Sequence, residues 1–397
     1  MNILILTADY YAQLGGKFTH ILMLKSGLEE LGHSVDILFP KRTPLNALVI
    51  SGGGRILDFF GIGIYYRQNA IKAMLRFSLG NFLCRKRIDI INAEDVIAFF
   101  AINRSKIKVP VILTIHGELA QEMESAGHIK SAFEKKLFLN MEKRSYELAD
   151  YTVTVDTRLK NHIQDLAPLA KSKLQIIQNF IDVESFRNRI DLLNMEEIKK
   201  KTGISSDKKV ILVPRRLVLK CGVIYAIKAA ELIRNKFNRC DLVFLIVGVG
   251  PERSNILNYI NDNKLQELVS LIDGAEYDKM PEFYKIAEVV LIPSINVKGY
   301  IEATSLSAIE AMAANIPVIA SDIGGLAEMI SNGVTGILVP EKSSEDIAKN
   351  IIKILDNEDL RNVITSAAFD YVSKNHSNRV AAQKFARIYT NEIKNNG

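Results

Sequence analysis

The sequence predicts an α/β protein of two domains with a parallel, doubly wound sheet, and three observations lead to this fold class. The chain has 397 residues, too many for one core of ordinary size, and its apolar fraction of 48% is that of a globular protein. Apolar runs at 2–7 and 34–39 are joined by a glycine pair and a helical stretch at about 19–31, which makes a β-loop-α-β unit. A further strand at 209–213 opens a second domain.

Composition and cysteine spacing exclude several classes of protein. The three cysteines, Cys84, Cys221 and Cys240, show no CxxC spacing, so we expect neither a disulfide framework nor a zinc site, and a reducing cytoplasm fits. The first apolar run is too short for a signal peptide and lacks its basic start. Because the sequence has no run of ~18 apolar residues, a membrane-spanning helix is not expected.

Positive charge is concentrated in residues 41–110. The whole chain carries a net charge of +6, whereas this segment alone has twelve lysines and arginines against four acidic residues. Within it, 71–87 has apolar positions at helical spacing and a basic end, and the glycines 52–54 suggest a loop. Two interpretations of 71–87 stay open: a basic amphipathic helix on anionic lipid, or a core helix with a basic C-terminal cap. No nucleic-acid-binding motif is visible, so nucleic acid is not an expected partner.

Strand ends in the first half carry a glycine pair and a histidine. Gly15-Gly16 follows the first strand, where it either lets a ligand approach the backbone or only forms a tight turn. His116 comes directly after the expected strand 109–115, so it should point into the crevice at the carboxyl edge of the sheet. A structural hydrogen-bonding role is the alternative for His116. Other elements are expected at 89–92, 134–149 and 150–156.

The stretch 294–340 carries the chemistry of the second half. The strand 289–292 leads into a loop with Glu302, and a helix of small residues is expected at about 305–314, with Glu310 inside it. Unpaired N–H groups at the start of this helix favour an anion such as phosphate. Ionised carboxylates accept hydrogen bonds from sugar hydroxyls. The sequence therefore predicts a site for a phosphate joined to a sugar, as in a nucleotide sugar.

Basic residues follow the strand 209–213. Arg215, Arg216 and Lys220 lie where the strand passes into a loop, and cations fixed there can hold a diphosphate and stabilise its charge as a glycosidic bond breaks. A solvated basic turn is the alternative. The next two strands, 241–250 and 268–272, end in Gly248-x-Gly250 and in Asp273-Gly274-Ala275, and both positions suit ligand-binding loops.

The second half resembles the retaining GT-B glycosyltransferases of family 4, also called group 1, which carry an E-x7-E signature. Glu302 and Glu310 have that spacing, and the flanks make the match specific: Pro293-Ser294, Ala311-Met312-Ala313, 317–321, Gly324-Gly325 and Glu328. The resemblance implies two Rossmann-like domains facing across a cleft. It implies an acceptor-side domain at 1–185 and a nucleotide-sugar donor domain at 186–377, with helix 378–397 packing back on the first.

The resemblance also implies roles for individual residues. Arg216, Lys220, Glu302 and His116 are expected to act at the donor sugar and its diphosphate, and Glu310 on the ribose. The remaining donor-binding residues come from strand ends and loops: Gly15, Gly16, Arg215, Gly250, Gly274, Ala275, Ala303, Thr304, Ser305 and Leu306.

The sequence departs from the family pattern at three places. Cys221 stands where the lysine commonly lies, so Lys220 is assigned in its place, and residues 303–305 replace Gly-Phe-Gly. Gln178 and Phe180 replace the Pro and Gly that usually end the first domain.

The expected activity is retaining transfer of a hexosyl group from a UDP- or GDP-linked sugar to a hydroxyl of a glycan or lipid-linked acceptor, in bacterial cell-surface polysaccharide synthesis. No D-x-D motif is present, so neither a metal nor another cofactor is expected. We expect a cytoplasmic enzyme with peripheral contact to an anionic membrane through 41–110. The alternatives are a GT-B epimerase or phosphorylase, and a protein that only binds a nucleotide sugar.

Overall fold

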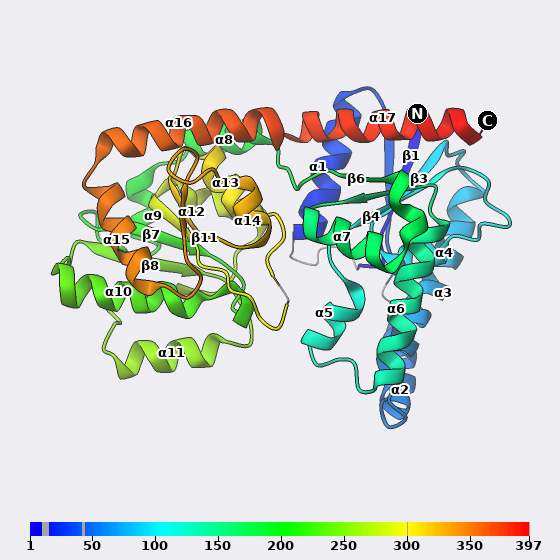
Figure 1. Cartoon of the computed structure of the whole chain (residues 1–397), viewed down its shortest axis with the longest axis horizontal. Helices are drawn as coiled ribbons and strands as arrows, with labels where there is room; N and C mark the ends of the chain where they lie inside the picture. The colour runs from blue at the N-terminus through cyan, green and yellow to red at the C-terminus, as the bar shows by residue number, and fades with distance from the viewer. Residues whose placement is uncertain (10–15, 42–43, 300, 397) are drawn as a thin grey trace. The chain divides into compact units, whose positions relative to one another are not determined.

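The chain forms two compact units (Figure 1). The computed structural model describes residues 1–9, 16–41, 44–299 and 301–396. Unit 1 consists of Met1–Gln178 together with Asn378–Gly397, and unit 2 of Asn179–Ser377. The units change before the expected boundary between 185 and 186, because the entering and leaving segments of unit 2 are bonded to each other. Ile181 pairs with Ser377, and the Ile181 N–H donates to the His376 carbonyl at 3.0 Å.

Unit 1 has a parallel six-stranded sheet among its described residues, in the order β2-β1-β3-β4-β5-β6. Its strands are short and mostly buried: β1 (Asn2–Leu6), β2 (Ser34–Leu38), β3 (Ile90–Ala93), β4 (Val111–Ile115), β5 (Tyr151–Thr154) and β6 (Leu174–Ile176). The chain leaves β1 toward β2 on one side and then returns to β3 on the other. This reversal creates a switch point between β1 and β3, where open α/β sheets bind their ligands.

Helices of unit 1 cover the sheet and extend from it: α1 (Gly16–Glu30), α2 (Pro44–Asp58), α3 (Gly63–Leu83), α4 (Val96–Ala101), α5 (Leu119–Ser125), α6 (Ala132–Leu148), α7 (Thr157–Leu166) and α17 (Asn378–Asn396). Residues of α3, α4, α6 and α7 join the strands in one buried cluster. The C-terminal helix α17 packs against α1. Gly27 permits this contact, because a β-carbon there would lie 2.6 Å from the Asn378 carbonyl oxygen.

Unit 2 has a second parallel six-stranded sheet, in the order β12-β11-β10-β7-β8-β9. Its strands are β7 (Lys209–Pro214), β8 (Leu242–Val247), β9 (Val269–Ile272), β10 (Ala287–Ile292), β11 (Val318–Ser321) and β12 (Ile337–Val339). In local numbering this is the 3-2-1-4-5-6 order of Rossmann sheets, and the switch point lies between β7 and β10.

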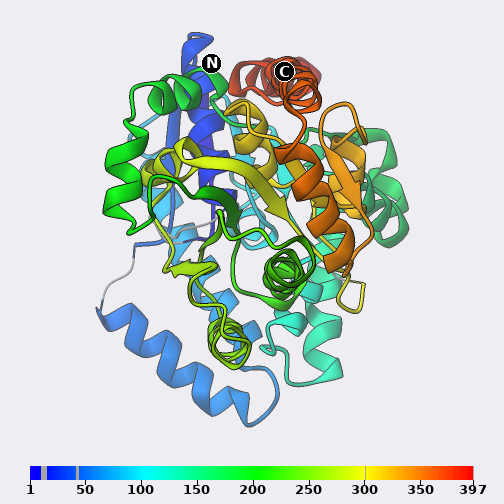
Figure 2. The same cartoon turned by 90° about the vertical axis from the view of Figure 1, so that its left-hand side faces the viewer.

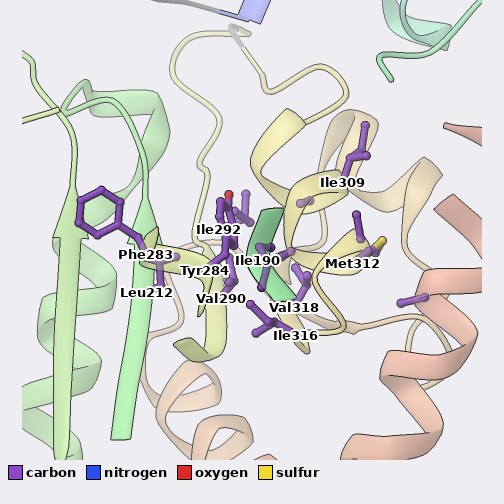
Figure 3. Packing of buried hydrophobic residues seen from close by; sticks show 14 of the residues in the cluster. Ile190, Leu212, Phe283, Tyr284, Val290, Ile292, Ile309, Met312, Ile316 and Val318 are labelled. Carbon is purple, nitrogen blue, oxygen red and sulfur yellow. The ribbon is translucent and has the colours of Figure 1, made fainter. Parts of the chain in front are cut away.

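Helices lie on both faces of the second sheet: α8 (Val183–Asp191), α9 (Met195–Lys201), α10 (Val223–Phe237), α11 (Arg253–Asp262), α12 (Met280–Lys285), α13 (Leu306–Ala313), α14 (Gly324–Met329), α15 (Ser344–Leu355) and α16 (Glu358–Asn375). Alternate strand residues enter two separate cores, as the period of a strand requires. Val210 and Leu212 pack with α8, α12 and α13 (Figure 3), whereas Ile211 and Val213 pack with α10, α11 and α15.

The expected strands and most expected helices are present, but the segment 44–87 differs from one expectation. The glycines 52–54 lie inside helix α2 and do not form a loop. Gly53 and Gly54 allow α2 to approach α3, because a β-carbon on either would lie under 3 Å from the Tyr66 or Arg67 side chain, whereas one on Gly52 would meet nothing within 4 Å. Residues 71–83 belong to α3, whose Leu75 and Leu79 are buried in the core of unit 1, so this stretch is a core helix. Among the residues that the structure describes, no helix is both long enough and apolar enough to cross a bilayer.

Candidate functional site

Polar side chains gather at the carboxyl edge of each sheet, next to its switch point. In unit 2 they come from the loops that follow β7 and β10, which are neighbouring strands. In unit 1 they come from the ends of β1, β3 and β4 and from the start of α1. Both clusters therefore lie where the strand order of a doubly wound sheet leaves room for a ligand.

Glycines let the backbone of unit 2 pack closely around the loop after β7. A β-carbon on Gly248 would lie 1.9 Å from the Arg215 carbonyl oxygen, and one on Gly250 would lie 2.3 Å from that of Leu217. Gly222 has a φ of +60°, and a β-carbon on it would lie 1.8 Å from the Pro293 carbonyl oxygen. Gly250, an expected donor-binding residue, thus has a structural reason to be glycine, since it supports the loop that carries Arg215 and Arg216.

Arg215 is the centre of a buried polar cluster. Its Nη2 donates to Glu302 Oε2 at 2.6 Å and to Ser294 Oγ at 2.9 Å, and its Nη1 donates to Ser305 Oγ at 3.2 Å. Nη2 also lies 3.4 Å from Cys221 Sγ. The guanidinium group therefore joins the loop after β7 to both ends of the loop between β10 and α13.

Arg216, which was expected to act at the donor diphosphate, is exposed. The two arginines differ in burial: Arg215 is buried, and Arg216 is open to solvent. An exposed arginine at a strand end remains available to an anionic ligand, whereas the guanidinium of Arg215 is already bonded to four side chains.

Glu302 lies between two cations. Its Oε2 is 2.6 Å from Arg215 Nη2 and 3.9 Å from Lys220 Nζ. Burial would raise the pKa of Glu302, but the charges of Arg215 and Lys220 outweigh it and hold the pKa below its ordinary value. Glu302 is therefore ionised at neutral pH, and Lys220, two residues before Gly222, does reach the signature carboxylate.

The start of α13 is packed more tightly than the sequence suggests. Thr304 and Ser305 are buried, while Ala303 and Leu306 are half-buried. The Thr304 carbonyl accepts from Asn179 Nδ2 at 2.9 Å, and the Ser305 hydroxyl accepts from Arg215. These contacts hold the turn before the helix and leave the half-buried part of its first turn, near Leu306, as the region that a ligand could contact.

Gly324 and Gly325 explain how α14 packs on that same turn. Gly324 has a φ of +51°, and its ideal β-carbon would lie 2.4 Å from the Glu302 carbonyl oxygen. The Gly325 N–H donates to that carbonyl at 3.1 Å. The glycine pair of the family signature is thus a packing surface for the loop that carries Glu302.

Glu310 lies inside α13 and is buried. Its Oε2 accepts from the Tyr284 hydroxyl at 2.7 Å, and Tyr284 also donates to the Ser307 carbonyl at 3.2 Å. Burial raises the pKa of Glu310 to about 7, and the hydrogen bond from Tyr284 offsets only part of this effect. Glu310 therefore titrates near neutral pH, unlike Glu302. Gly274 and Ala275, expected beside the nucleotide, follow β9. Gly274 is exposed and Ala275 is half-buried.

Unit 1 has an ion-pair cluster at its own switch point. Lys17 Nζ, one residue after Gly16 at the start of α1, lies 2.8 Å from Asp9 Oδ2 and 3.3 Å from Asp95 Oδ2. Asp95 caps α4 by accepting from the Ala98 N–H at 2.7 Å. Gly15, an expected donor-binding residue, lies outside the described residues.

His116 ends a chain of hydrogen bonds at the carboxyl edge of unit 1. Its Nε2 lies 2.8 Å from Glu94 Oε2, Asn92 donates to the other oxygen of Glu94, and the Thr114 hydroxyl donates to Asn92 Oδ1 at 3.1 Å. Burial, and then the charge of Lys17, lower the pKa of His116 to about 3, so the imidazole is neutral at physiological pH. Burial raises the pKa of Glu94 to about 7.

His20, Glu94 and His116 form the one group among the described residues whose ligand atoms lie close enough, within 4.8 Å of one another, to bind a metal ion. Two imidazoles and a carboxylate are suitable ligands for zinc. Lys17 opposes such an ion, because its charge already acts on both Glu94 and His116. We therefore assign Glu94 and His116 to hydrogen bonding.

Sequence reasoning found part of this site and missed part of it. It did not single out Tyr284, which holds Glu310, and nothing in the sequence marks this residue. Ser294, which holds Arg215, was expected only as a flank of the signature. It also missed Glu94 and Asp95, although two acidic residues directly after a strand are a readable signal.

Comparisons with known proteins agree with this arrangement. The family model for glycosyl transferases group 1 matches residues 194–371, and the model for glycosyltransferase family 4 matches 14–185. An uncharacterized glycosyltransferase of Methanocaldococcus jannaschii is 25% identical over 98% of both chains. Sucrose-phosphate synthase from Thermosynechococcus elongatus has a TM-score of 0.75 at 16% identity over the full length of both chains. Anabaena HepE, in complex with UDP and glucose, has a TM-score of 0.68 at 16% identity, over 98% of this chain and 99% of HepE.

Two Rossmann-like units with these structural neighbours define the fold as GT-B. Because the two family models together match most of the chain, the protein belongs to the group 1 glycosyltransferases of family 4. It is therefore a transferase that takes a sugar from a nucleotide sugar.

Proposed function

We propose that this protein transfers a hexosyl group from a UDP- or GDP-linked sugar to a hydroxyl of a glycan or lipid-linked acceptor, with retention of the anomeric configuration and without a metal. The observation that carries this proposal is the placement of Glu302 and Glu310 around the start of α13, with Lys220 beside Glu302. HepE shares the fold and binds UDP and glucose, which supports a nucleotide sugar as donor.

The carboxylates bind the donor, and the cations act on its leaving group. Ionised Glu302 accepts hydrogen bonds from hydroxyls of the donor sugar, and Glu310 from the ribose. When the bond from the anomeric carbon to the diphosphate breaks, charge develops on the leaving oxygen. This negative charge would be stabilised by Arg216, by Lys220 and by the N–H groups at the start of α13. Arg215 keeps Glu302 in position and is a positioning residue.

Unit 1 contributes the acceptor side in this proposal. Neutral His116, bonded to Glu94 through Nε2, has its other ring nitrogen left to interact with a sugar hydroxyl. We propose a cytoplasmic location and a role in bacterial cell-surface polysaccharide synthesis, as expected from the sequence. An epimerase or phosphorylase of the same fold would release nucleotide or use sugar phosphate without an acceptor, and a binding protein would do neither.

Lys220→Ala provides the test of the proposed chemistry. Losing one cation at the leaving group costs ~3 kcal/mol, so turnover should fall about 10²-fold. The control is Lys236→Ala, because the Lys236 side chain is exposed and pairs with a surface acid, Glu345. Unchanged turnover in Lys220→Ala would contradict the role of Lys220.

Product analysis separates the three candidate functions. UDP- and GDP-sugars are first screened by thermal shift, and the stabilising donor is then incubated with and without a glycan and lipid extract. A glycosyltransferase attaches the sugar to an acceptor in the extract. Nucleotide release that is equal without the extract would support the epimerase or phosphorylase, and donor binding without any turnover would support the binding protein.

A further inference from the structure

One end of unit 1 exposes several large apolar side chains. Ile56, Phe59, Phe60 and Phe133 are 68%, 89%, 68% and 63% exposed. The first three lie at the end of α2 and in the turn that follows it, and Phe133 lies in the first turn of α6. We call these four residues, with the neighbouring Arg55 and Lys130, the phenylalanine tip. Clustered exposed aromatic rings in a folded protein usually mark an interaction site.

The tip is a built structure that joins two distant segments. The Ser131 hydroxyl, at the start of α6, donates to the Gly61 carbonyl at 2.8 Å. The Tyr65 N–H, in the first turn of α3, donates to Glu134 Oε1 at 3.0 Å. Gly61 has a φ of +68°, which lets the chain turn tightly between α2 and α3. The turn carrying Phe59 and Phe60 is thereby fixed beside the start of α6.

The aromatic rings at the tip are held together and face solvent. The centroids of Phe59 and Phe60 are 5.5 Å apart in an edge-to-face arrangement. In Figure 1, α2 and α6 reach the same lower end of unit 1, and Figure 2 shows α2 in blue at the lower edge. The exposed rings are therefore presented by the ends of helices and by no part of the sheet.

The charge around the tip is positive. Arg55, Lys130 and Lys136 are exposed. The nearby acids are already used within the protein: Asp58 is bonded to Arg67, whose interaction lowers the pKa of Asp58, and buried Glu134 accepts from the N–H groups of Tyr65 and Lys130. Residues 55–61 and 130–136 together contain four basic side chains, Arg55, Lys130, Lys135 and Lys136, against the two acids Asp58 and Glu134, so the tip carries a net positive charge.

We propose that the phenylalanine tip docks this protein on an anionic phospholipid bilayer. Aromatic rings favour the interfacial region of a bilayer, where lysine and arginine contact lipid phosphates. The cores of protein interfaces, in contrast, are depleted in lysine, which disfavours a protein partner. This proposal does not depend on donor chemistry, so it stands or falls separately from the proposed function.

The tip is a different surface from the stretch 71–87. Leu75 and Leu79 are buried in the core of unit 1, Arg76 donates to carbonyls at the end of α4, and Lys86 pairs with Asp36 at 2.5 Å. The apolar face of that helix is therefore not available to lipid. Phe77 is 73% exposed on α3, but it lies fourteen residues after Gly63, or about 20 Å along the helix from the tip. It is a matched control.

The sequence contains no tryptophan, so one introduced residue reports on its own environment. The full chains of Phe59→Trp and Phe77→Trp are mixed with vesicles of phosphatidylcholine alone or with one third phosphatidylglycerol. We expect the emission of Phe59→Trp to shift to shorter wavelength only with the anionic vesicles, and less at high salt. The emission of Phe77→Trp should stay unchanged. Equal shifts at both positions, or none at residue 59, would overturn the proposal.

Co-sedimentation provides the quantitative measurement. Phe59→Ser/Phe60→Ser should lower the fraction bound to anionic vesicles at least tenfold, and Phe77→Ser should not. Thermal unfolding should be unchanged, because these side chains are exposed. Binding that is equally strong to phosphatidylcholine would refute the role of the cations. If sedimentation shows a dimer that the double variant loses, the tip binds a second copy of the chain and the proposal is wrong.

Discussion

Replacing Arg215 by methionine tests the difference between the two neighbouring arginines. The change removes a buried cation that bonds Glu302, Ser294 and Ser305, and leaves the half-buried, ionised Glu302 without its main partner. Breaking a buried ion pair in this way typically costs ~3–5 kcal/mol. We expect the lower end, about 3 kcal/mol, because Lys220 Nζ lies 3.9 Å from the same carboxylate oxygen and still offsets part of its charge.

The loss can be measured as a change in thermal unfolding. Unit 2 covers 179–377, and for a unit of this size 1 kcal/mol corresponds to about 2–4 °C in Tm. Differential scanning calorimetry should therefore show the transition of unit 2 about 6–12 °C lower in Arg215→Met. Arg216→Met is the control, and its stability should stay within about 0.5 kcal/mol of the wild type because Arg216 is exposed.

The pH dependence of the same comparison has a defined sign. The pKa of Glu302 is held below its ordinary value of 4.5, so its pairing stabilises the fold above that pH and is lost as pH falls through the lower, folded value. The difference between the wild type and Arg215→Met should shrink in acid. Equal Tm values for Arg215→Met and Arg216→Met at neutral pH would refute the assignment of Arg215 as the buried positioning residue.

Two further predictions concern Glu310 and Gly27. Because burial raises the pKa of Glu310 from 4.5 to about 7, its stabilising contribution is complete below pH 4.5 and is lost, by up to ~3 kcal/mol, as pH rises through about 7. Glu310→Gln should therefore be more stable than the wild type in urea unfolding at pH 8 and lose this advantage below pH 4.5. A difference in unfolding free energy that does not change with pH would contradict the raised pKa of Glu310. Gly27→Ala should lower stability by ~1–3 kcal/mol, since its β-carbon would meet α17, and unchanged protease sensitivity at α17 would argue otherwise.

Much of the fold could be read from the sequence, because strand and helix periodicity are local. The apolar runs that became β1, β2, β7 and β10 are separated by glycine-containing turns and helical stretches, which is the pattern of a parallel sheet. The expectation failed for the glycines 52–54 because their conformation is decided by contact with another helix. Tyr66 and Arg67 of α3 occupy the space that side chains at Gly53 and Gly54 would need, so these two glycines serve helix packing and do not form a turn.

The candidate site was predicted in its residue types and only partly in its geometry. Glu302, Glu310 and Lys220 could be named because spacing along the chain and a resemblance to a family identify them. That Arg215 is buried and Arg216 exposed could not be foreseen, because adjacent residues at a strand end point in opposite directions and only the packed loop decides which one is buried.

The sequence by itself determined the elements, the parallel sheets and the class of ligand, since periodicity, turn residues and charge act over a few neighbouring residues. Only the tertiary structure decided which cation holds Glu302, that Tyr284 bonds Glu310, and that the turn with Phe59 and Phe60 lies beside the start of α6. These features join segments that are far apart along the chain. They depend on burial and on distances across the fold, which no local pattern contains.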